Sequence, residues 1–256
     1  MLKVCILASG SSGNATFVGT ARTRILIDAG IARREMESRL TAIGEDPARL
    51  DAILITHEHA DHVAGLLRWL RRFQTPVFMT HLAAAAIDWE DVRPRLETFQ
   101  SGAGLRIGDI DVRSFTVPHD AVDPVGYRFE AEGVSAGLVT DLGYIPESIK
   151  HHLRGVDLLV LESNHDLEML RVGPYPWAVK QRVMSRNGHL SNDTVSDYIR
   201  QEMDRNVDTL VLSHLSENNN HPDLVRLIAE QALQARRHGA RLVVAEPRKQ
   251  TGVFQY

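Results

Sequence analysis

The chain has one cysteine, Cys5, among its 256 residues, so no disulfide bond can form within it. Cys5 lies in the apolar run of residues 4–8, VCILA, and is therefore expected to be a buried, small hydrophobic residue. A chain without disulfides suits a reducing compartment, and we expect the protein to be cytoplasmic.

Long apolar runs are also missing. No segment approaches the roughly 18 consecutive apolar residues of a membrane span, so no membrane partner is expected. Residues 1–10, MLKVCILASG, contain too short an apolar stretch for a signal peptide and are expected to form a strand and a turn.

Excess positive charge is absent as well, since 29 Lys and Arg against 33 Asp and Glu give a formal net charge of −4. This balance excludes a generally basic surface for nucleic acid but is compatible with a local basic groove. No Gly-Lys-Ser or Gly-Lys-Thr is present to form a nucleotide P-loop, and Gly102-Ala103-Gly104 lacks the spacing of a dinucleotide fingerprint.

Linkers, charge blocks, low-complexity tracts and internal repeats are lacking too, so residues 1–256 are expected to form one domain. Strands alternate with amphipathic helices, and a run of short strands separated by Gly-Asp, Asp-Pro and Glu-Gly turns predicts an antiparallel meander over residues 104–138. The pattern indicates an α/β fold with two mixed, mostly antiparallel sheets between helices. The helices are expected at residues 33–43, 63–73, 82–87, 192–203 and 222–238.

Residues 52–62, AILITHEHADH, combine an apolar strand with three imidazoles and two carboxylates at its end. Groups this dense would repel and desolvate one another unless a cation joined them. His57, His59, Asp61 and His62 are therefore candidate metal ligands, and one loop could serve two metal sites.

Completing two sites needs further ligands from later strand ends. His119 follows a strand expected to end at residue 117, Asp141 follows one that ends near residue 139, and His214 follows one that ends near residue 212. Each is the first strong ligand after its strand, so all three are candidate ligands.

This set resembles the metallo-β-lactamase superfamily, whose motifs run Asp, His-x-His-x-Asp-His, His, Asp, His. The resemblance implies a four-layer αββα sandwich and two divalent ions of zinc, manganese or iron. It further implies that His57, His59 and His119 hold one ion, that Asp61, His62 and His214 hold the other, and that Asp141 bridges them. Asp28 would orient the ligand loop without binding metal.

Asp141 in place of a cysteine is unlike the lactamases proper and is typical of the phosphodiesterase and nuclease branch. A finer resemblance is to the YycJ/WalJ-like, exonuclease-like group, with ribonuclease Z and the cyclic phosphodiesterases as more distant relatives. It rests on the segments ASGSSGN (8–14), LESNHD (161–166), GPYPW (173–177), NGHLSN (187–192) and LSHLS (212–216). No clear long exosite arm of the ribonuclease Z kind is present, which argues against tRNA processing.

His189 and Glu162 resemble the His/Glu pair by which ribonuclease Z-like enzymes relay a proton. A histidine held by a carboxylate is suited to protonate a leaving alkoxide. His165 is a competing candidate for this role, and Asp61 is expected to serve catalysis as well as metal binding.

Substrate contacts are expected from two segments. The loop of residues 9–14 offers small polar side chains that could face a phosphate, namely Ser9, Ser11, Ser12 and Asn14. The segment of residues 175–186 combines aromatic and basic residues, of which Tyr175 and Arg182 are expected to contact a polyanionic strand.

The function expected from these residues is a two-metal phosphodiester hydrolase, with DNA or RNA attacked from an end by a hydroxide that bridges the ions. A small-molecule hydrolase of the same fold, acting on a cyclic nucleotide, a thioester or a lactone, is an alternative. A non-catalytic regulatory protein is another, although an intact ligand set argues against it.

Overall fold

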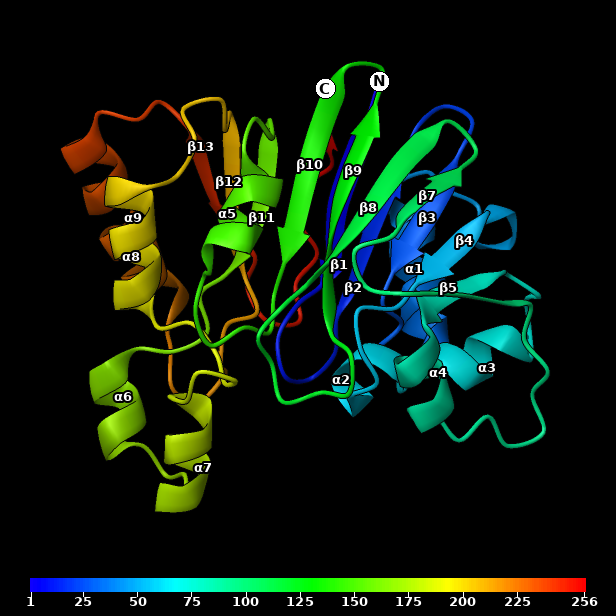
Figure 1. Cartoon of the computed structure of the whole chain (residues 1–256), viewed down its shortest axis with the longest axis horizontal. Coiled ribbons are helices and arrows are strands. Elements are labelled where there is room, and N and C mark those ends of the chain that lie inside the picture. The colour runs from blue at the N-terminus through cyan, green and yellow to red at the C-terminus, as the bar shows by residue number, and fades with distance from the viewer.

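Apolar side chains alternate along the central strands, so each strand contributes to two different cores. In β1 (Lys3–Ala8), Val4 and Ile6 belong to the core between the two sheets, whereas Cys5 and Leu7 belong to the core beneath the helices. Sheets buried on both faces need helices outside them. The structure, a computed structural model that describes residues 1–256, has this four-layer αββα architecture (Figure 1).

Two sheets of seven strands pack face to face. The first has the order β14 (Phe254–Gln255), β1, β2 (Ala15–Gly19), β3 (Arg24–Ile27), β4 (Ala52–Leu54), β5 (Val77–Thr80) and β6 (Leu96–Phe99). The second has the order β13 (Arg241–Val244), β12 (Thr209–Ser213), β11 (Leu158–Glu162), β10 (Val134–Val139), β9 (Val125–Ala131), β8 (Ile110–Thr116) and β7 (Gly104–Ile107).

Each sheet contains three antiparallel and three parallel pairings. The expected meander of residues 104–138 is confirmed, but the sheets are evenly mixed, so the expectation of mostly antiparallel sheets was wrong. The parallel pairings arise because helices make all six connections, from β3 to β4, β4 to β5, β5 to β6, β10 to β11, β11 to β12 and β12 to β13.

Helices cover the outer face of each sheet (Figure 1). On the first sheet lie α1 (Arg33–Ala42), α3 (Leu66–Leu70) and α4 (His81–Ala86), which bury Met36, Trp69 and Ala83. On the second lie α5 (Glu147–Leu153), α8 (Asn192–Gln201) and α9 (Pro222–Arg236). None of the helices combines the length and the hydropathy needed to cross a membrane.

The helix expected over residues 63–73 is divided into α2 (Ala60–Val63) and α3. The interruption has a backbone cause. The carbonyl of Asp61 accepts a hydrogen bond from the N–H of Asn14, and the N–H of Gly65 donates to the carbonyl of Ala29 instead of continuing the helix. The residues that follow β4 are thus hydrogen-bonded to neighbouring loops.

Six short elements were not predicted: η1 (Pro47–Arg49), β6, α5, α6 (Leu167–Val172), α7 (Trp177–Val183) and β14. Two of them, α6 and α7, project beyond one edge of the sandwich, and we refer to residues 166–188 as the arm (Figure 1). The base of the arm is fixed closely to the body, since a Cβ at Gly143 would lie 2.3 Å from the backbone of Arg186.

Candidate metal centre

The ligand-bearing residues follow strands that end at one edge of the sandwich. The loop that begins after β4 is pressed against the loop that follows β3, where a Cβ at Gly30 would lie only 1.7 Å from the carbonyl oxygen of Asp61. Only glycine fits such a close approach. The adjacent parallel strands β3 and β4 thereby bring Asp28 and the residues 57–62 together.

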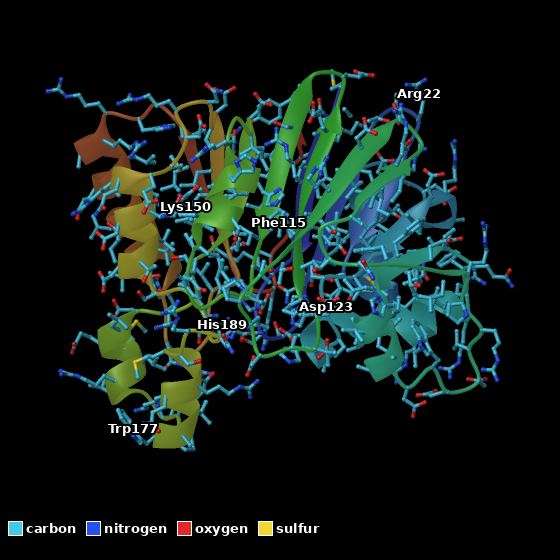
Figure 2. All side chains as sticks on the ribbon, viewed as in Figure 1. Arg22, Phe115, Asp123, Lys150, Trp177 and His189 are labelled. Carbon is cyan, nitrogen blue, oxygen red and sulfur yellow. The ribbon has the colours of Figure 1, made fainter.

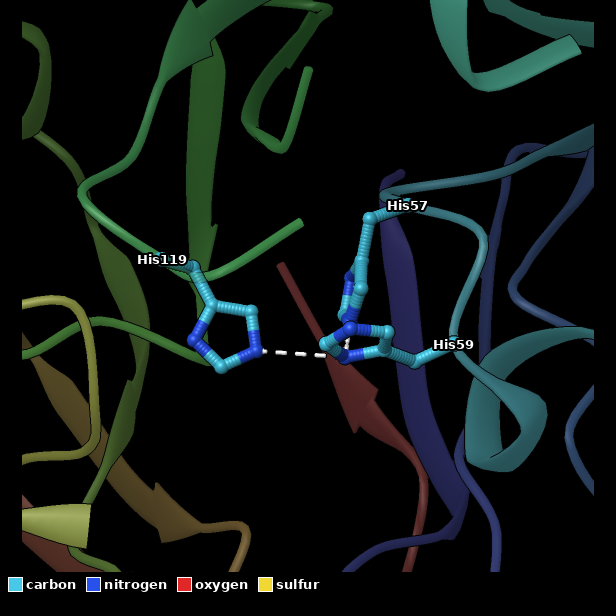
Figure 3. A group of neighbouring side chains, drawn as sticks. All are labelled: His57, His59 and His119. Carbon is cyan, nitrogen blue, oxygen red and sulfur yellow. Dashed lines mark hydrogen bonds between the residues drawn. The ribbon is translucent and has the colours of Figure 1, made fainter. Parts of the chain in front are cut away.

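Three imidazoles form a first ligand group, which consists of His57, His59 and His119 (Figure 3). His59 Nδ1 lies 3.1 Å from His57 Nε2 and 3.3 Å from His119 Nε2. His119 donates from Nδ1 to the carbonyl of Gly188 (3.2 Å), which leaves Nε2 free to bind metal. The group thus joins the loop after β4 to the loop after β8.

Two carboxylates and two imidazoles form a second ligand group, Asp61, His62, Asp141 and His214. Asp141 lies at its centre, with Oδ2 at 3.3 Å from His62 Nε2 and Oδ1 at 3.5 Å from His214 Nε2. Asp141 Oδ1 is also 3.8 Å from His119 Nε2 of the first group. Its carboxylate therefore stands between the two groups.

The donor atoms fit divalent ions. Within each group the candidate ligand atoms all lie within 4.8 Å of one another. Asp141 Oδ2 and His214 Nε2 are buried without a hydrogen-bond partner, a costly arrangement that a cation would relieve. Imidazole nitrogen and carboxylate oxygen suit zinc, manganese and iron.

Asp28 lies beneath the second group and not in it. Its Oδ1 accepts from the N–H of Thr56 (2.8 Å), and its Oδ2 lies 2.8 Å from His62 Nδ1. This contact fixes the ring of His62 with Nε2 directed toward Asp61 and Asp141. A carboxylate behind a ligating imidazole is a common support for bound metal.

The two groups differ electrostatically. Burial lowers the pKa of His57 well below its ordinary value and also lowers the pKa of His119. Burial would lower the pKa of His62 and His214 too, but nearby carboxylates outweigh it and raise both pKa values. These are Asp28 and Asp141 for His62, and Asp141, Asp61 and Glu162 for His214. An ion at the second group would displace protons from His62 and His214, and one at the first would meet neutral imidazoles at His57 and His119.

His189 and Glu162 are adjacent to both groups. His189 Nδ1 lies 2.8 Å from Glu162 Oε1, and the other carboxylate oxygen of Glu162, which is fully buried, accepts from the N–H of Leu142 (3.1 Å). Burial lowers the pKa of His189, but Glu162 outweighs burial and the pKa is raised. His189 lies at the base of the arm, whereas Trp177 lies at its tip (Figure 2).

His165 has a different environment. Its side chain is buried, Nδ1 has no hydrogen-bond partner, and burial lowers its pKa to about 4. It does not line the cavity at the metal centre. His189 is therefore better placed than His165 to donate a proton to a substrate.

A cavity of about 230 Å³ opens over the ligand groups and His189. Its walls include Ser11 on one side and, from α7, Val179, Arg182 and Val183. Arg182 forms an ion pair with Asp120, which also lines the cavity. Asp120 was not predicted, although it follows His119 directly in the sequence.

The remaining residues expected to contact substrate lie elsewhere. Ser9 and Asn14 are buried, and their side chains bond to His214 and Asp61. Ser12 is exposed but does not line the cavity, and the hydroxyl of Tyr175 accepts from Asn218 Nδ2 (3.2 Å) outside it. Ser9 and Asn14 are therefore engaged beneath the ligands, and their expected contact with a phosphate stays a prediction.

Glu58 belongs to neither ligand group. Its Oε1 accepts from the N–H of Val122 (2.9 Å), so it ties the loop after β4 to the loop that carries His119. The spacing in His-x-His-x-Asp-His does not reveal this contact, which only the fold creates.

A family model described as "Beta-lactamase superfamily domain" matches residues 23–215. The fold agrees: the metallo-β-lactamase fold protein YhfI from Bacillus subtilis superposes over 100% of both chains with a TM-score of 0.77 at 15% identity. Zinc-bound PqqB from Methylobacterium extorquens superposes over 98% of this chain and 99% of its own, with a TM-score of 0.72 at 19% identity.

Closer relatives are found by sequence. Exodeoxyribonuclease WalJ of Streptococcus pneumoniae is 36% identical over 91% of this chain and 89% of its own. Exodeoxyribonuclease YycJ of Bacillus anthracis is 35% identical over 93% of this chain and 91% of its own. Ribonuclease Z of Mycobacterium bovis is more distant, at 27% identity over 62% of this chain and 69% of its own. The chain therefore belongs to the metallo-β-lactamase superfamily and, within it, to the WalJ/YycJ family.

Proposed function

We propose that the protein is a two-metal phosphodiesterase that degrades DNA from an end. Its similarity to WalJ and YycJ, both named exodeoxyribonucleases, supports the substrate class. The two adjacent ligand groups support the two-metal centre. The identity of the ions and the cytoplasmic location stay predictions.

The first ligand group would hold one ion and the second group the other, with Asp141 between them. Bound divalent ions would supply an activated water as nucleophile and neutralise the phosphate oxygens. Asp61 lines the cavity, so it would hold its ion there and also face the substrate. Asp28 keeps the ring of His62 in position throughout.

His189 would protonate the oxygen that leaves when the phosphodiester bond breaks. Glu162 holds Nδ1 of His189, so Nε2 is the atom available to donate that proton. Glu162 also stabilises the protonated imidazole, because its carboxylate raises the pKa of His189. Ser11 and Arg182 line the same cavity and would contact the phosphate that is cleaved or the next phosphate of the strand.

The observation that carries the proposal is the His189–Glu162 pair in one cavity with both ligand groups. It is tested with purified protein whose metal content is measured by plasma mass spectrometry. The substrates are bis-para-nitrophenyl phosphate, end-labelled linear DNA, covalently closed circular DNA and RNA. We expect two ions per chain, cleavage of linear DNA with release of terminal nucleotides, and intact circular DNA.

A chelator provides the first control, and the activity should return when the ion is added back. Metal-replete protein that is inert toward every phosphodiester would overturn the proposed reaction. Cleavage of circular DNA would instead replace attack from an end by internal attack.

A further inference from the structure

The loop between β1 and β2, residues 9–14, contacts three of the four residues of the second ligand group. Ser9 bonds to His214, while Asn14 bonds to Asp61 and lies against His62. We propose that this loop is a positioning element for the second group and sets the affinity of the ion bound there. The proposal rests on the two-metal centre proposed above.

Ser9 acts on the backbone of His214. This residue has a φ of 56°, in the left-handed region that residues other than glycine rarely adopt. Its N–H donates to Ser9 Oγ (2.7 Å), and its carbonyl accepts from Asn164 Nδ2 (2.9 Å). Side chains from two remote loops therefore hold both backbone polar groups of a strained ligand.

Asn164 is itself fixed by a buried amide network. Its carbonyl accepts from Asn220 Nδ2 (3.0 Å) and from the N–H of Ser216 (2.8 Å). Asn220 Oδ1 in turn accepts a hydrogen bond from Asn192 Nδ2 (2.9 Å). The support on this side of His214 is therefore rigid, and Ser9 supplies the opposing contact.

Asn14 acts on the other two ligands. Its N–H and its Nδ2 both donate to the carbonyl of Asp61 (2.8 and 3.3 Å), and Nδ2 also lies 3.1 Å from the ring of His62. Its Oδ1 accepts from the N–H of Gly10 (2.9 Å), which closes the loop on itself. One amide thus links the loop conformation to the placement of Asp61 and His62.

The contacts are selective for one group. No hydrogen bond joins residues 9–14 to His57, His59 or His119. The first group is instead held by Thr56 and by the carbonyl of Gly188. A substitution in the loop should therefore lower the affinity for the ion at the second group and leave the affinity at the first group unchanged.

The test uses the full chain, depleted of metal and titrated with zinc or manganese by calorimetry, and repeated for Ser9→Ala, Asn14→Ala and Ser12→Ala. We expect wild type to bind two ions. Ser9→Ala and Asn14→Ala should keep one ion at wild-type affinity and bind the other about 10- to 100-fold more weakly. Ser12→Ala changes an exposed residue of the same loop and should retain both affinities.

His59→Ala assigns the ions, because it should remove the ion of the first group. When Asn14→Ala is added to His59→Ala, the affinity for the single remaining ion should fall. Unchanged affinities in both loop variants, or equal weakening of both ions, would overturn the proposed role of the loop. Wild type that binds fewer than two ions would contradict the two-metal centre itself, so the two failures are distinguishable.

Discussion

The two sheets share one plan, and their differences show how the site is divided. In each, an antiparallel portion is followed by three parallel pairings. β3 and β10 occupy the same place, at the junction of the two portions. Each is followed, within two residues, by an aspartate with a left-handed backbone, Asp28 with a φ of 60° and Asp141 with a φ of 59°.

These two aspartates have opposite environments. The oxygens of Asp28 are occupied by Thr56 and His62, so its carboxylate is a fully bonded support. Asp141 has a buried oxygen without a hydrogen-bond partner and faces His62 and His214. Position and backbone do not make an aspartate a ligand, because the donors that surround it decide the role.

Asp141→Asn tests the ligand side of this comparison and should have the largest effect. Asparagine tolerates the left-handed backbone but removes the central negative charge, so activity should fall by about 10³-fold or more as ions are lost. Metal content and kcat/KM on bis-para-nitrophenyl phosphate measure this. Retention of two ions and near-normal turnover would show that Asp141 is not shared between the groups.

His189→Asn should have the next largest effect on activity. It removes the proposed general acid, which only the half of the chain that forms the second sheet contains. We expect kcat on DNA to fall about 10²- to 10⁴-fold while both ions remain bound. The loss should be much smaller on a para-nitrophenyl ester, whose leaving group needs no proton. Equal losses on both substrates would remove His189 from proton transfer. His165→Asn should lose less than His189→Asn and show no dependence on the leaving group.

Glu162→Gln should shift the pH profile. The carboxylate raises the pKa of His189, which in its protonated form is the proposed acid, so removal of the carboxylate charge should lower that pKa. The alkaline limb of kcat should therefore move to lower pH by about one unit or more. An unmoved alkaline limb would contradict the link between Glu162 and His189.

Asp28→Asn is matched to Asp141→Asn in residue type and backbone and should have the weaker effect. Asparagine leaves one acceptor oxygen for Thr56 and His62 to share, so the ring of His62 loses its support. We expect metal affinity at the second group to fall about 10- to 100-fold, measured by titration. A loss as large as that of Asp141→Asn would erase the distinction between support and ligand.

Arg182→Ala should have the smallest effect. The arm lies between β11 and β12 and has no counterpart in the first half, and Arg182 is its basic residue at the cavity. Loss of one exposed cation should raise KM for DNA a few-fold, about 1 kcal/mol, with kcat nearly unchanged. Arg171→Ala is the matched control, because Arg171 lies on α6 and pairs with Glu168 away from the cavity.

Sequence alone located the candidate ligands because each follows an apolar strand, and parallel strands bring their ends to one edge. The resemblance to ribonuclease Z-like enzymes paired His189 with Glu162, and the two side chains are in contact although they are 27 residues apart in the chain. The helix ends were harder to predict. The helix over residues 63–73 was divided because Asp61 and Gly65 bond to loops that lie far from them in the sequence.

The polar loop of residues 9–14 shows the limit of sequence reasoning. A loop of small hydroxyl residues and glycines has the same sequence pattern whether it contacts a phosphate or positions a metal-binding side chain. Only the fold brings Ser9 to His214, which is 205 residues away. The arm was missed for a similar reason, since α6 and α7 are too short to show a helical period.

Each ligand group takes side chains from both sheets, since His57 and His59 meet His119, and Asp61 and His62 meet Asp141 and His214. Bound ions would therefore be cross-links between the two halves, closing loops that span most of the chain. Ion binding to the folded form alone adds stability in proportion to the logarithm of ion concentration. The metal supply of the cell would then govern how long the protein survives proteolysis, besides how fast it works.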